Sequence, residues 1–115
     1  MKNKKPDINL LDVVPVQTVQ FETDDQQQIV LIQPKFTHQF MVKHVLPRLK
    51  KPNYRITLDK FGSTVWNYCD GKRSVADIAE CLLKDFGDAI EPVHDRLGIF
   101  IRTLKKNRFI DYRIL

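Results

Sequence analysis

Residues 54–75 read YRITLDKFGSTVWNYCDGKRSV, and the change of pattern within this stretch decides the fold. At its start, Tyr54, Ile56 and Leu58 alternate with polar residues, which is the two-residue period of a β-strand with one buried face. Asp59 follows, and a carboxylate at that position caps the first turn of a helix. Apolar residues then recur at helical spacing, so we expect a strand followed directly by a helix that ends at an Asp-Gly pair.

Two more amphipathic helices are predicted after this one. Ser74, with Asp77 three residues later, forms a capping box that opens a helix over residues 74–86, and Gly87 ends it. Pro92 takes the first position of a third helix, which runs to residue 107. The residues expected in the core are Phe61, Val65, Trp66, Cys69, Val75, Ile78, Ala79, Leu82, Leu83, Phe86, Val93, Leu97, Phe100, Ile101 and Leu104.

The N-terminal half predicts a β-hairpin. Residues 16–22 alternate between apolar and polar side chains, and after a polar turn residues 29–32 form a continuous apolar run, so the second strand should be the more buried one. Residues 1–12 are charged and lack periodicity, which indicates a mobile basic arm. Phe36 and Phe40 favour a short helix that ends before Pro47, and Phe109, Ile110 and Tyr112 favour a short final strand or an extended tail. The fold class is therefore α+β: a small antiparallel N-terminal β-sheet followed by a three-helix bundle.

Charge and hydropathy limit the possible partners and locations. Nineteen Lys and Arg against fourteen Asp and Glu give a net charge of +5, which favours an acidic partner: nucleic acid, an acidic peptide or an anionic membrane surface. Hydrophobic residues make up 43% of the chain but form no long apolar run, so we expect neither a transmembrane helix nor a signal peptide. The sequence predicts a reduced cytoplasmic protein of about one domain.

The residues that usually carry chemistry do not form a site. Cys69 and Cys81 lie on apolar helix faces, where a thiol most often is a small buried hydrophobe, although the cations just after Cys69 leave a reactive thiolate open. His38 and His44 are six residues apart, which does not suit two metal ligands on one helix face. No nucleotide-binding loop or nucleophile motif is present, so we expect a non-enzyme without metal or cofactor.

A longer pattern is specific enough to compare with known families. The run LDxxGSxVWxxCDGKRSVxDIAxxLxxxF, from Leu58 to Phe86, resembles the signature of the PqqD-like family, small proteins that accompany radical SAM enzymes in peptide modification. Trp66, the turn at Cys69, and the pair Ile78 and Ala79 all fall at the family's spacing. The resemblance implies a winged-helix-like module, a RiPP recognition element, so residues 13–115 are expected to be a single peptide-binding domain. Compared with the shorter family members, this chain adds the N-terminal hairpin and residues 36–51.

Two functions remain open, and charge placement separates them. Three helices after a small sheet are compatible with a winged-helix DNA-binding regulator, which offers the start of its recognition helix to DNA. Here Asp88 and Glu91 precede the third helix and Asp95 lies in its first turn, where carboxylates repel phosphate. The basic residues lie instead at the C-terminal end of that helix, so nucleic acid is the disfavoured partner.

The favoured function is capture of the leader of a ribosomally made precursor peptide, which is then presented to a radical SAM modifying enzyme. A peptide-binding module needs an open strand edge for main-chain pairing and nearby positions for alternate side chains. Residues 54–58 are the candidate edge, and the outward face of the third helix, where Ile99 lies off the apolar stripe, is the candidate opposite wall. The predicted peptide-binding residues are Tyr54, Arg55, Ile56, Thr57, Asp95, Ile99, Arg102, Thr103 and Lys106.

Overall fold

A computed structural model describes residues 9–34 and 53–114 of the chain. It divides into two compact units. The sheet unit is Val19–Ser63, and the helical unit is Met1–Thr18 together with Thr64–Leu115. The helix predicted between Phe36 and Pro47 lies outside the described residues, as does most of the predicted N-terminal arm; Leu10–Asp12, at the end of that arm, forms a short 3-10 helix, η1.

The sheet unit contains three antiparallel strands in the order β2-β3-β4, with bounds Gln20–Thr23, Ile29–Pro34 and Asn53–Thr57. The predicted hairpin is confirmed as β2 and β3, and its turn is fixed by the Asp24 carboxylate, which accepts the amides of Gln26 at 2.9 Å and Gln28 at 2.8 Å. All four residues of β2 are exposed, whereas β3 buries Ile29, Val30 and Leu31. The second strand of the hairpin is therefore the more buried one, as its continuous apolar run predicts.

The single strand predicted over residues 16–22 is wrong, because this stretch divides between two sheets. β1, Val13–Gln17, pairs in antiparallel register with β5, Ile110–Ile114, whereas β2 begins only at Gln20. The hydrogen bonds of Thr18 explain the break: its amide donates to the carbonyl of Phe109 at 3.0 Å and its hydroxyl to the carbonyl of Arg108 at 3.0 Å. The end of β1 is thereby fixed to β5. The final strand that the sequence left open is β5.

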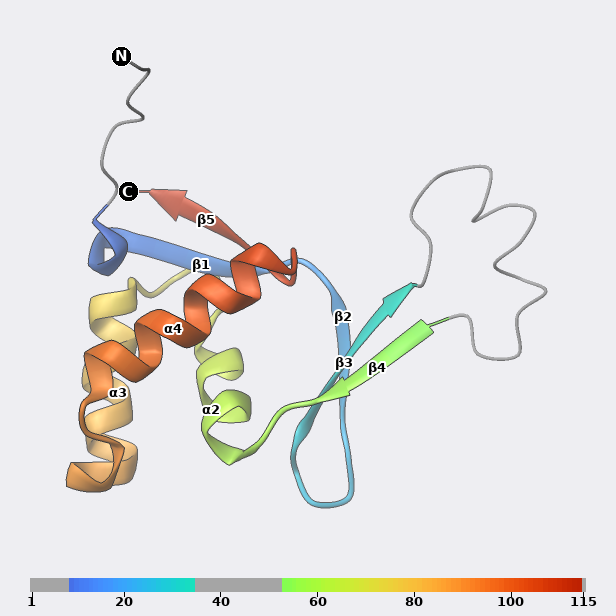
Figure 1. The fold of residues 1–115 in the computed structure, drawn as a ribbon, viewed down its shortest axis with the longest axis horizontal. Helices are drawn as coiled ribbons and strands as arrows, with labels where there is room; N and C mark the ends of the chain where they lie inside the picture. Colours follow the sequence, from blue (N-terminus) through green and yellow to red (C-terminus); the bar gives the residue numbers. More distant parts are fainter. Residues whose placement is uncertain (1–8, 35–52, 115) are drawn as a thin grey trace, which may run out of the picture. The chain divides into compact units, whose positions relative to one another are not determined.

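The helical unit packs two helices against the β1 and β5 pair, which lies across α3 and α4 in Figure 1. The helix α2 begins in the sheet unit and continues into the helical unit. The helices are α2 (Lys60–Tyr68), α3 (Val75–Phe86) and α4 (Val93–Lys106), with a short 3-10 helix η3 (Gly87–Ile90) before α4. The predicted α+β class, antiparallel strands followed by three helices, is thus confirmed. Its helical core comprises Val65, Trp66, Cys69, Val75, Ile78, Ala79, Leu82, Val93, Leu97, Ile101 and Leu104, together with Val13 and Val14 of β1.

The helix ends follow the sequence signals closely. The Asp59 carboxylate accepts the amide of Gly62 at 2.7 Å, and Ser74 with Asp77 makes the predicted capping box. Gly87 has φ 65° and ψ −151°, a positive-φ conformation that glycine adopts readily, and its amide donates to the carbonyl of Leu83 at the end of α3. Pro92 is the N-cap of α4, so this helix begins at Val93, one residue later than predicted. Four residues predicted to be core are only partly buried, because they lie at the borders of their helix stripes; these are Phe61, Leu83, Phe86 and Phe100.

Candidate functional site

The candidate site begins with the backbone of β4, which lies at the edge of the sheet among the described strands. The amide of Leu58 donates to the carbonyl of Ile29 at 2.8 Å, and the register continues through the pair of Ile56 with Leu31. In an antiparallel pair, hydrogen-bonded positions alternate with positions whose amides and carbonyls point away. Ile56 therefore faces β3, whereas the main-chain groups of Arg55 and Thr57 point to the side of β4 on which no described strand pairs.

The side chains of β4 divide between the two faces of the sheet. Tyr54 and Ile56 share the face of Leu58, but burial fades along it, since Leu58 is 9% exposed, Ile56 is half-buried and Tyr54 is 53% exposed. The buried face predicted for this strand is thus wrong at its Tyr54 end. On the opposite face, Arg55 contacts Glu22 of β2 at 2.5 Å in an ion pair whose two side chains are about half exposed. The edge therefore offers apolar surface on one face and charge on the other.

A buried hydroxyl holds the end of β4 in place. Ser63, in the first turns of α2, is 5% exposed. Its hydroxyl accepts the amide of Ile29 at 2.8 Å and donates to the carbonyl of Leu58 at 3.1 Å. The hydroxyl thus takes the place of the second main-chain bond that the Leu58 and Ile29 pair would otherwise make. This contact ends the β3 and β4 ladder and fixes the strand to the helix that follows.

The other predicted residues lie on α4, in the helical unit, and form one exposed stripe. Asp95, Ile99, Arg102, Thr103 and Lys106 are all exposed, and Ile99 is 62% exposed, as its place off the apolar stripe predicts. The Thr103 hydroxyl donates to the carbonyl of Ile99 at 2.8 Å. The four residues of β4 and the five of this stripe therefore belong to different units, and each group is described separately.

Gly98 lies beside this stripe, and the guanidinium of Arg102 packs over it. A Cβ atom built on Gly98 would meet two nitrogens of the Arg102 guanidinium, each at 3.4 Å. Arg102 therefore lies back along α4 over the glycine, one turn toward the start of the helix. The result is a flat cationic surface next to the exposed Ile99 side chain.

The Cys-Asp-Gly turn after α2 has a structural role. The Cys69 carbonyl accepts the amide of Gln17, and the amide of Gly71 donates to the carbonyl of Pro15, so the turn pairs with β1. Gly71 has φ 80°, and a Cβ there would meet Cγ2 of Val16 at 3.3 Å. The positive φ therefore favours glycine, and the close approach of Val16 adds to the cost of any larger residue.

The two cysteines differ in burial. Burial, with a smaller effect from the neighbouring Asp70 carboxylate, raises the pKa of Cys69 to about 12. Its thiol therefore stays protonated at neutral pH, which excludes the thiolate that the cations at Lys72 and Arg73 left open. Cys81 is partly buried.

Searches of the described residues for metal-binding clusters and membrane spans found neither. No group of three or more His, Cys, Asp or Glu side chains within residues 9–34 and 53–114 is arranged to hold a metal ion. His38 and His44 lie outside the described part of the chain. None of the helices described combines the length and the hydrophobicity that crossing a membrane requires.

The start of α4 is occupied by a carboxylate. A side-chain oxygen of Glu91 accepts the amide of Val93 at 3.0 Å, and Asp95 lies in the first turn. A helix N-terminus that binds phosphate offers unpaired amides and a positive local potential. Here one of those amides already has an anionic partner from the chain itself, and two carboxylates oppose a further anion.

Sequence reasoning missed two contributions. Glu22, the partner of Arg55, became visible only with the strand register. A cavity at the end of α4, lined in part by Thr18 and Asp111, joins residues far apart in the chain and has no signal in the sequence. By contrast, the alternation of residues 54–58 does predict an edge strand, and the register with β3 shows that Arg55 and Thr57 point to the side where no strand of the described chain pairs.

The comparisons with known proteins agree with the motif. A family model described as Coenzyme PQQ synthesis protein D (PqqD) matches residues 43–110, which is more than half of the chain. Searches of the curated proteins and of the solved structures each found no significant match. The matched span includes β4 and all three described helices, so it covers the strand edge, the motif turn and the exposed stripe of α4. The chain therefore belongs to the PqqD family.

Proposed function

We propose that this protein is a non-catalytic peptide chaperone that binds the leader of a ribosomally made precursor and presents the precursor to a radical SAM modifying enzyme. Membership of the PqqD family implies a peptide-binding partner protein in the synthesis of a cofactor or a modified peptide. The leader, the radical SAM partner, the absence of catalysis and a cytoplasmic location belong to the proposal. The single observation that carries it is the side of β4 on which none of the described strands pairs.

The leader pairs as an added strand with the main-chain groups of Arg55 and Thr57, which point away from β3. Each of these residues offers one donor and one acceptor, and a net main-chain hydrogen bond contributes roughly 1 kcal/mol. Side chains of the added strand would alternate between the face of Tyr54 and Ile56 and the face of Arg55. Main-chain pairing thus supplies affinity, and the two faces supply specificity.

The exposed stripe of α4 is proposed as a second peptide-contacting surface. Ile99 offers an apolar anchor whose burial by a peptide is favourable because its side chain is exposed to water, and Arg102 and Lys106 attract acidic residues of a leader. Residues 13–115 would then act as one peptide-binding module. A double-mutant cycle between Thr57→Pro on β4 and Ile99→Asp on α4 tests whether one leader uses both surfaces, since coupled contacts give non-additive losses.

The decisive experiment places proline on β4. Thr57→Pro removes an amide that points away from β3, so the protein should stay folded and bind the leader at least about fivefold more weakly, the effect of roughly one lost hydrogen bond plus exclusion by the ring. Thr57→Ala is the matched control and keeps the amide. Ile56→Pro removes an amide that faces β3 and should unfold the sheet unit.

Fluorescence anisotropy with the labelled leader of a short reading frame beside the gene measures binding, and circular dichroism measures folding. Normal leader binding by a folded Thr57→Pro protein would exclude strand addition at this edge. A labelled DNA duplex is titrated at low and moderate salt for comparison. Tight duplex binding that falls steeply with salt would favour the alternative, a winged-helix DNA-binding regulator.

A further inference from the structure

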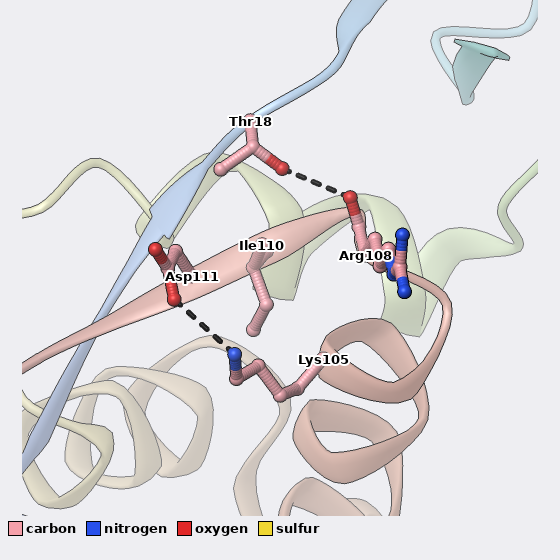
Figure 2. A pocket seen from close by; sticks show the side chains of 5 residues that line it. All are labelled: Thr18, Lys105, Arg108, Ile110 and Asp111. Atoms are coloured by element: carbon pink, nitrogen blue, oxygen red, sulfur yellow. Dashed lines mark hydrogen bonds and ion pairs between the residues drawn. The ribbon is translucent and has the colours of Figure 1, made fainter. Parts of the chain in front are cut away.

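A cavity of about 270 Å³ lies at the C-terminal end of α4, within the helical unit. Its lining comes from the end of α4, the start of β5 and the residue after β1: Thr18, Lys105, Arg108, Ile110 and Asp111. Figure 2 shows the buried Ile110 side chain between those of Asp111 and Arg108, with Lys105 across from it. The cavity thus has an apolar floor and a charged rim.

The two cations of the rim differ in ion pairing. The ammonium of Lys105 contacts the Asp111 carboxylate at 3.2 Å and lies 5.3 Å from the centre of the Tyr112 ring. Arg108 has no ion pair with any residue in the described part of the chain. The lining therefore carries one unit of positive charge that its own carboxylate does not balance.

The backbone of Arg108 is held in a conformation that favours glycine. Its φ is 64°, its amide donates to the carbonyl of Lys105 at 3.0 Å, and its carbonyl accepts the Thr18 hydroxyl at 3.0 Å. This is the position just past a helix end, where glycine is the usual residue and a larger one costs roughly 1 kcal/mol. An arginine at this position, which has a cost in stability, points to a use for its side chain.

The chemistry of the rim favours a carboxylate over a phosphate. A guanidinium presents paired donors that match the two oxygens of a carboxylate, and the apolar floor at Ile110 suits the methylene groups of an Asp or Glu side chain. The single unit of net positive charge in the lining is balanced by a singly charged carboxylate, whereas a doubly charged phosphate would leave an excess negative charge beside Asp111. The exposed rim residues are within reach of a side chain from another protein.

The cavity also differs in direction from the proposed leader surface on the same helix. Lys105 follows Ile99 by six residues, which places it about 120° around α4. A peptide strand that covers Ile99 would therefore leave the cavity open. Arg102 and Lys106 lie between these two directions and add positive potential beside both.

We propose that this cavity is a carboxylate-binding site that receives an Asp or Glu side chain of a second partner protein, with Arg108 as the main donor and Lys105 shared with Asp111. The identification of that partner as the modifying enzyme rests on the proposed function. The carboxylate chemistry does not, because it follows from the lining residues alone.

The test is an NMR titration of the full-length ¹⁵N-labelled protein with the peptide acetyl-(Glu)₄-amide. Saturable shifts are expected at the amides of Arg108, Ile110 and Asp111, and none with acetyl-(Gln)₄-amide. Arg108→Gly should weaken binding at least about fivefold, the effect of roughly one charge-assisted hydrogen bond, while its unfolding temperature is unchanged or higher. Arg108→Asn, which tolerates the same backbone conformation, should behave alike. Lys84→Gln, an exposed cation on α3, is the matched control for charge and should bind like the parent.

Equal shifts with the Gln peptide, parental binding by Arg108→Gly, or the same loss in Lys84→Gln would overturn the proposal. Binding of inorganic phosphate more than about tenfold tighter than the Glu peptide would also overturn it, in favour of a phosphate site. The titration contains no leader peptide, and the Thr57→Pro protein should keep its shifts. Failure of the cavity and failure of strand addition are therefore distinguishable.

Discussion

Ser63→Ala offers a direct test of how the edge strand is held. The hydroxyl of this buried residue accepts the amide of Ile29 at 2.8 Å and donates to the carbonyl of Leu58 at 3.1 Å. Alanine removes both hydrogen bonds at once. Because Ile29 is only 2% exposed, water has little access to its amide and cannot readily replace the lost acceptor. The substitution is otherwise conservative because alanine fits the same helical position.

The expected loss follows from the cost of an unsatisfied buried donor, roughly 1 to 3 kcal/mol, with a smaller addition for the under-bonded carbonyl of Leu58. The higher helix propensity of alanine offsets about 0.5 kcal/mol of it. We therefore expect Ser63→Ala to lower the free energy of unfolding by about 1.5 to 3 kcal/mol. Thr23→Ala, which removes an exposed hydroxyl from β2, should change it by less than about 0.5 kcal/mol.

Two measurements check this expectation. Urea unfolding followed by circular dichroism gives the change in stability, and hydrogen exchange gives the protection of the Ile29 amide, which should fall in Ser63→Ala more than at neighbouring strand amides. Ser63→Thr keeps the hydroxyl and should retain that protection. Parental stability together with unchanged exchange at Ile29 would show that the hydroxyl does not hold the strand, and the account of the β4 end would fail.

Three further predictions concern the turn, the cysteines and the helix stripe. Gly71→Ala should lose about 1 to 3 kcal/mol in urea unfolding, because φ 80° and the 3.3 Å approach to Val16 both oppose a Cβ. A thiol reagent at neutral pH should label Cys81 in the folded protein and Cys69 only after unfolding. Because the folded pKa of Cys69 lies near 12 instead of its ordinary 9.0, stability should fall as pH rises from about 9 toward 12, by at most about 1.4 kcal/mol per pH unit. Ile99→Asp should leave stability unchanged and weaken leader binding by about 1 to 3 kcal/mol; an unfolded variant would show that Ile99 is core.

Much of the fold could be predicted because its signals are local. The Asp59 cap, the box at Ser74 and Asp77, and Gly87 act within one helical turn, so they need no knowledge of the remaining structure. In α3, the helical spacing of the apolar residues likewise is enough to predict which side chains are buried. The sequence therefore predicts the ends of these helices to within a residue or two.

The errors arose where a distant segment decides the structure. Nothing within residues 16–22 indicates that the chain changes sheets there, because the break depends on hydrogen bonds from Thr18 to residues 108 and 109. The exposure of Tyr54 has a similar cause, since alternation predicts which face a side chain occupies but not what covers that face. Which amides of β4 point toward β3 could likewise be assigned only from the register of the two strands.

The motif that identifies the family and the residues proposed to bind peptide are different sets, and this has a consequence for specificity. Trp66, Cys69 and Ile78 are fully buried, and Gly71 is required by its turn, so these residues determine the fold. The proposed peptide contacts are exposed positions such as Arg55 and Ile99, whose identities the packing does not restrict. Proteins with the same motif can therefore differ at every such contact without changing the fold. Family membership consequently predicts the fold of this chain. The precursor must instead be identified from the exposed residues of β4 and of the α4 stripe.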